Sequence, residues 1–134
     1  MKNLWNRTAA ILALIIGAMA IVAGGKVLLG QDPGYFVIDW LPVYNFTVGV
    51  LSFFLTAVLI WKGSRYALPA AVVTLASHTT VMIVLQRGFE EVVASESIRA
   101  MTIRIVTWSV ITTLLLVQAW LKREAPGKRI RAEG

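Results

Sequence analysis

Four long apolar segments constrain the fold of this chain more than any other feature of its sequence. They occupy residues 8–29, 43–61, 66–85 and 101–121 of the 134. A helix of about 20 apolar residues, rising about 1.5 Å per residue, crosses a hydrocarbon layer of about 30 Å. Each segment is therefore predicted to be a transmembrane helix. The connections are short, so we expect an all-α, four-helix transmembrane bundle with up-down-up-down topology.

The composition leaves little room for anything outside this bundle. Hydrophobic residues make up 57% of the chain, which excludes an ordinary soluble domain. The longest connection, residues 86–100, is too short to fold by itself, so residues 1–134 are predicted to form a single integral-membrane domain. The chain has no cysteine, and P-loop, GxGxxG and HExxH motifs are also absent. A non-enzymatic role is therefore favoured over an enzymatic one.

The charged residues are sorted by sign between the two ends of the predicted bundle. One end carries the termini and the connection at 62–65, with nine basic and two acidic residues. The other end carries four basic and five acidic residues. Because basic residues are enriched in cytoplasmic loops, both termini are predicted to be cytoplasmic, in a multi-pass protein of a bacterial inner-membrane type. The same rule explains the net charge of +6 without any nucleic-acid partner.

Small and polar residues form stripes on the first two segments. Within a bilayer, small residues let helices approach closely, so such stripes mark helix–helix contacts. These stripes are predicted to face the bundle interior. They comprise Ala10, Ala13, Gly17, Ala20 and Gly24 on the first segment, and Asn45, Gly49, Ser52 and Thr56 on the second.

Aromatic residues near the segment ends are predicted to mark the membrane interfaces. Tyr35, Trp40 and Tyr44 would lie at the outer interface. Trp108 fits neither interface and is expected to pack inside the membrane.

His78 is the only histidine and lies well inside the third segment. Ionisable residues at membrane depth are costly and often functional, and a neutral imidazole can ligate haem or hydrogen-bond a quinone. A haem would need Met19, Met101 or another subunit for its second ligand. The structural alternative, favoured over haem or quinone, is a neutral histidine bonded to a serine or threonine of a neighbouring helix. The candidate ligand site comprises His78, Thr74, Ser77, Arg104 and Trp108, and no metal site or catalytic residue is predicted.

Arg104 is the second ionisable candidate, near the outer end of the fourth segment. We expect an ion-pair network of Glu96, Arg99 and Arg104, in which Glu96 and Arg99 share a helix face. Snorkelling of the arginine toward the interface is one alternative. An anionic ligand or a lipid head group is another.

The sequence gives three hypotheses about function. The favoured one is a non-catalytic accessory or assembly subunit of a larger membrane complex, with lipid, other membrane subunits or further copies of itself as partners. The second is a bundle that binds haem, a quinone or a lipid around His78. The third is an oligomeric channel or transporter.

Overall fold

The computed structural model describes residues 2–133, and all its regular elements are helices. The helices are α1 (Lys2–Leu28), α2 (Leu41–Val50), η1 (Leu51–Thr56), α3 (Ala57–Trp61), α4 (Ala67–Gly88) and α5 (Ser95–Glu133). Four stretches are long and apolar enough to cross a membrane: Leu4–Leu28, Leu41–Trp61, Ala67–Gly88 and Ser95–Leu121. The predicted all-α bundle with alternating helix directions is therefore confirmed, and its architecture is that of a multi-pass membrane protein.

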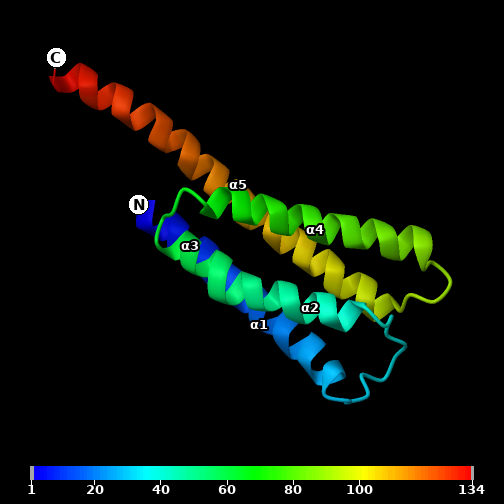
Figure 1. Ribbon diagram of the computed structural model, residues 1–134. Coiled ribbons are helices and arrows are strands. Elements are labelled where there is room, and N and C mark those ends of the chain that lie inside the picture. The colour runs from blue at the N-terminus through cyan, green and yellow to red at the C-terminus, as the bar shows by residue number, and fades with distance from the viewer. Residues whose placement is uncertain (1, 134) are drawn as a thin grey trace.

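The two ends of the bundle differ in what they carry. The start of α1, the short turn between α3 and α4, and the C-terminal part of α5 lie at one end, the terminal end (Figure 1). The connections between α1 and α2 and between α4 and α5 lie at the other, the loop end (Figure 1). The last turns of α5 project beyond the other helices at the terminal end.

The helices are longer than the apolar segments that predict them. The first was expected at residues 8–29 and begins at Lys2, and the fourth was expected at 101–121 and extends over Ser95–Glu133. The apolar pattern locates the part of a helix that lies in lipid, whereas the backbone can stay helical in the polar interface and beyond it.

The second membrane span is interrupted by a π-helical stretch, η1, which the sequence did not predict. A π-helix bonds each N–H to the carbonyl five residues back, and the N–H of Ala57 accordingly donates to Ser52 O. Ser52 and Thr56 are 2% and 3% exposed, while Phe54 and Leu55 between them face outward. The wider turn changes the rotation about the helix axis. The buried face of α2, before the stretch, and the buried face of α3, after it, therefore both remain buried.

The closest helix contact joins α1 to α2 and η1 through glycines. A Cβ atom on Gly24 would lie 2.6 Å from Pro42 O, and one on Gly49 would lie 2.9 Å from Gly17 O. Such distances leave no room for a side chain, so the two backbones touch. Gly17, Gly24 and Gly49 of the two predicted stripes thus form the contact face between the first two spans.

The remaining helices complete the bundle around α1 and α5. α1 also packs against α5, and α4 packs mainly against α5, with smaller contacts to η1 and α3. A core in the terminal half includes Ala13, Ile60, Ala71 and Ile111, and it contains Trp108, which is 1% exposed. Trp108, which was expected to pack within the membrane, lies in the core of the bundle. Ile38, Leu41, Leu85 and Met101 form a second core at the loop end.

Candidate functional site

His78 is buried in α4 and bonds to a tyrosine of α2. Its Nδ1 lies 2.9 Å from Tyr44 Oη, and the two rings meet edge to face with centroids 5.8 Å apart. Either atom can donate, depending on the imidazole tautomer. The sequence predicted a serine or threonine as the partner and placed Tyr44 at the interface. The structure instead shows a partly buried Tyr44 that reaches inward to His78, which is 2% exposed.

Thr74 and Ser77, the hydroxyl residues grouped with His78 from the sequence, bond within their own helix. Thr74 Oγ1 donates to Ala70 O and Ser77 Oγ to Val73 O, each at 2.8 Å. A hydroxyl bonded to the carbonyl four residues back has its proton engaged locally. The structure therefore does not bring these two hydroxyls together with His78 in one hydrogen-bonded set.

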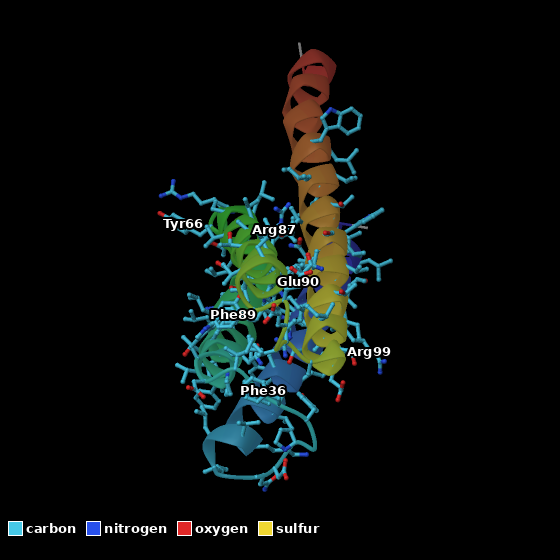
Figure 2. All side chains as sticks on the ribbon, turned by 90° about the vertical axis from the view of Figure 1, so that its right-hand side faces the viewer. Phe36, Tyr66, Arg87, Phe89, Glu90 and Arg99 are labelled. Atoms are coloured by element: carbon cyan, nitrogen blue, oxygen red, sulfur yellow. The ribbon has the colours of Figure 1, made fainter. Side chains whose placement is uncertain are left out.

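Arg104 is 5% exposed in α5, and its Nη1 donates to Asn45 Oδ1 of α2. The expected ion pair with Glu96 is replaced by this bond to a neutral amide. Glu96 Oε1 instead accepts a hydrogen bond from Ser95 Oγ at 2.7 Å, at the exposed start of α5. The physical reason is depth, because Arg104 lies two turns further into the bundle. Arg99 is exposed at the loop end of α5 and points away from α4 (Figure 2).

A small cavity of about 40 Å³ lies beside Arg104 at the loop end. It is enclosed by the end of α1, the connection to α2, and the starts of α2 and α5. Its polar lining consists of Arg104, Asn45, Tyr35 and Ser97. Asn45 was expected only as part of a packing stripe, and Tyr35 only as an interface residue. The signal that could have linked Asn45 to Arg104 is their similar predicted depth below the same interface.

Trp108 does not line this cavity. It lies one turn beyond Arg104 along α5, where it packs with alanines of α1 and α4 such as Ala13 and Ala71. The five residues grouped from the sequence thus separate: His78 pairs with Tyr44, Arg104 lines the cavity, and Trp108 lies in the apolar core, while Thr74 and Ser77 bond to carbonyls of their own helix.

A larger cavity of about 320 Å³ lies at the terminal end, between α1, the turn after α3, and α5. Asn6, Ser64, Arg65 and Gln118 supply its polar lining, and Ile60, Leu68 and Leu115 supply apolar walls. Sequence reasoning missed this cavity, because its lining comes from helix ends that are far apart along the chain.

The candidate sites are therefore the two interior polar contacts and the two cavities described above, which differ greatly in volume. No protein-family model, no curated protein and no solved structure matches this chain. Its function is inferred below from the geometry of these groups.

Proposed function

We propose that this protein is a non-catalytic integral-membrane subunit that assembles with other membrane proteins or with further copies of itself. The observation that carries the proposal is the engagement of the ionisable groups at membrane depth. His78 is bonded to Tyr44, and Arg104 to Asn45. A catalytic acid, base or nucleophile must reach a substrate. Groups that bond across helices instead hold the bundle in one arrangement, as a structural subunit requires.

The proposed orientation places both termini in the cytoplasm, in a membrane of the bacterial inner-membrane type. Its support is the excess of basic residues at the terminal end, where nine basic and two acidic residues lie. The cation of Arg7 also lies over the Trp61 ring there, with 5.5 Å between the guanidinium carbon and the ring centroid. Such a pair of an arginine and an aromatic ring suits the boundary between lipid and water.

The C-terminal part of α5 gives the proposed subunit an element for assembly. The membrane span ends at Leu121, whereas α5 continues to Glu133 and projects past the bundle (Figure 1). An isolated helix shorter than about 12–15 residues is marginal in water. This segment contains five basic residues. An acidic surface of a partner subunit would stabilise such a helix.

Native mass spectrometry after mild extraction from the source membrane tests this function. We expect a complex of fixed stoichiometry that contains this chain and at least one more membrane subunit or copy. A variant truncated after Leu121 should form less of the complex. A second variant with Arg99→Gln, which changes one exposed charge at the loop end, should retain it. A lone monomer under every mild extraction condition would contradict the proposal.

A second candidate function is the binding of a small ligand, which the cavity at the terminal end favours. Its volume of about 320 Å³ lies at the lower limit of small-molecule sites, about 300–1,000 Å³. The ligand classes considered for His78, haem and quinones, would be detected in the purified protein by a Soret band or by extraction and mass spectrometry. His78 does not line this cavity, whereas the half-buried Ala119 does. A cofactor that is lost in Ala119→Trp, which fills the cavity, and retained in His78→Ala would favour this candidate over the structural subunit.

A further inference from the structure

Arg104 carries a buried positive charge in a bundle whose acidic groups lie elsewhere. Its side chain is 5% exposed, and a guanidinium keeps its charge in proteins. Removing an ion from water costs several kcal/mol unless an opposite charge and hydrogen bonds compensate. The side chain therefore requires a counterion or a set of acceptors within reach.

The part of the chain whose side chains the structure describes, residues 4–121, provides no carboxylate for this role. All five acidic side chains in that range are exposed: Asp32, Asp39, Glu90, Glu91 and Glu96. The partner that Arg104 has is the neutral amide of Asn45. One accepting oxygen also leaves most of the five guanidinium N–H groups for other acceptors.

The cavity beside Arg104 has the lining of an anion site. Besides the guanidinium, it presents the Asn45 amide and the hydroxyls of Tyr35 and Ser97. Ser97 lies in the first turn of α5, the end of a helix that carries a positive partial charge. Val27 and Met101 are among the apolar residues that enclose the cavity. Hydrogen-bond donors and two sources of positive potential thus converge on a space without a carboxylate.

We propose that this cavity binds one small monovalent inorganic anion of halide size, such as chloride. The single positive charge of Arg104 balances one negative charge. The site therefore favours a monovalent anion over phosphate or sulfate. The volume of about 40 Å³ is far below the roughly 300 Å³ at which small-molecule sites begin. The bound anion would connect α2 and α5 through Asn45 and Arg104. The proposal does not depend on the subunit function proposed above.

The anion dependence of thermal unfolding tests the proposal on the intact chain. A ligand that binds only the folded state raises the Tm. In detergent of zero net charge and at constant ionic strength, replacing gluconate by chloride should raise the Tm by about 5 °C. Bromide should act like chloride. Equal Tm values in chloride and gluconate would overturn the proposal.

The variant Asn45→Asp isolates the charge argument. It retains the oxygen that accepts from Arg104 and adds the missing negative charge at the same place. We expect the Tm of this variant in gluconate to be at least as high as the Tm of the parent in chloride. Replacing gluconate by chloride should then no longer raise the Tm of the variant. The matched control Arg99→Gln removes an exposed arginine of the same helix and should retain the full effect. An unchanged chloride effect in Asn45→Asp would overturn the assignment to this cavity.

A lipid phosphate is the other source of negative charge near this end of the bundle. Adding phosphatidylglycerol to the chloride-free micelles distinguishes the two sources. A rise in Tm with this lipid but not with chloride would show that the site takes a head group and would overturn the small-anion proposal. A rise with chloride in lipid-free micelles supports it.

Discussion

The hydroxyl oxygen of Tyr44 lies 2.9 Å from Nδ1 of His78, so that one hydrogen bond joins α2 to α4 in the interior of the bundle. The backbone of α2 packs mainly against α1, and α4 packs mainly against α5. The bond therefore links the two helix pairs of the fold through a buried His78 and a partly buried Tyr44.

Replacing Tyr44 by phenylalanine should destabilise the bundle by about 0.5–2 kcal/mol. The change removes the hydroxyl and leaves His78 without this partner, and hydrogen bonds between membrane helices have about this strength. The free energy of unfolding can be measured by titration with SDS. A double-mutant cycle with His78→Leu should give a coupling of about 0.6 kcal/mol.

Tyr66→Phe is the matched control for this prediction. Tyr66 is exposed, and its hydroxyl accepts a hydrogen bond from the neighbouring Arg65. Its loss should leave the free energy of unfolding within about 0.5 kcal/mol of the parent. The same small effect from Tyr44→Phe would show that the bond to His78 adds nothing to stability.

Gly24→Ala should destabilise the bundle by about 1–3 kcal/mol, because overpacking a tight contact forces the backbone to shift. The new Cβ would lie 2.6 Å from Pro42 O and 2.7 Å from Phe46 N, and neither backbone atom can rotate away. SDS titration again gives the free energy of unfolding.

Gly25, the neighbour of Gly24, provides the control, because Gly25→Ala is the same substitution one position further along α1. A Cβ on Gly25 would make ordinary contacts of 3.6 and 3.7 Å with the Phe46 ring. Gly25→Ala should be neutral or stabilising, because alanine also favours the helix. If both variants lost stability equally, a general helix effect rather than the close contact with α2 would be responsible.

The small-residue stripe and the polar pairs differ in how far the sequence determines them. Gly17 and Gly24 recur on one face of α1, and Gly49 lies on the facing side of α2. Small residues let helices pack closely in lipid, so the sequence predicted the contact. The partners of His78 and Arg104 depend on how far each helix rotates and slides against its neighbours. The periodicity of apolar residues does not determine the rotation and the axial position of a helix to within one turn. The sequence therefore identified His78 and Arg104 as candidates but missed Tyr44 and Asn45 as their partners.

The π-helical stretch limited the sequence prediction in a different way. Spacing along an ideal helix assumes about 3.6 residues per turn, and η1 departs from this between Leu51 and Thr56. Ser52 and Thr56 were predicted to face inward and do so. The residue types of this stretch carry no signature of the wider turn.

Deleting Leu55 from η1 should cost less stability than deleting Val73 from α4, although both side chains face outward. A π-helical turn contains one residue more than an α-helical turn, so removing Leu55 can restore an α-helix while both flanks retain their faces. Removing Val73 rotates the rest of α4 by about 100° and turns His78 away from Tyr44.

Expression level and SDS resistance of the two deletion variants measure this difference. We expect the variant without Leu55 to give folded protein, and the yield of folded protein from the variant without Val73 to be much lower. The reverse ranking would indicate that the wide turn is required for folding and does not simply accommodate an extra residue.

Single cysteines should report the proposed orientation, since the chain has none of its own. Asp32→Cys lies in the connection at the loop end and Lys62→Cys in the turn at the terminal end, and both positions are exposed. With both termini cytoplasmic, a membrane-impermeant maleimide added to intact cells should label Cys at position 32 only. Permeabilised cells should show labelling at both positions. Labelling of position 62 alone in intact cells would reverse the orientation.

Thr112→Val should leave the bundle unchanged or stabilise it by up to about 1 kcal/mol. The hydroxyl of Thr112 is buried in α5 without a hydrogen-bond partner among the described residues, and burying such a group is unfavourable. Valine has nearly the same shape and removes the polar atom. Thr74→Val is the control, because the hydroxyl of Thr74 bonds to Ala70 O of its own helix. Such a bond adds little to stability, so this variant should stay within about 0.5 kcal/mol of the parent. SDS titration of both variants gives the comparison. A loss of more than about 1 kcal/mol in Thr112→Val would contradict the prediction, because it would mean that this hydroxyl is hydrogen-bonded in the folded protein.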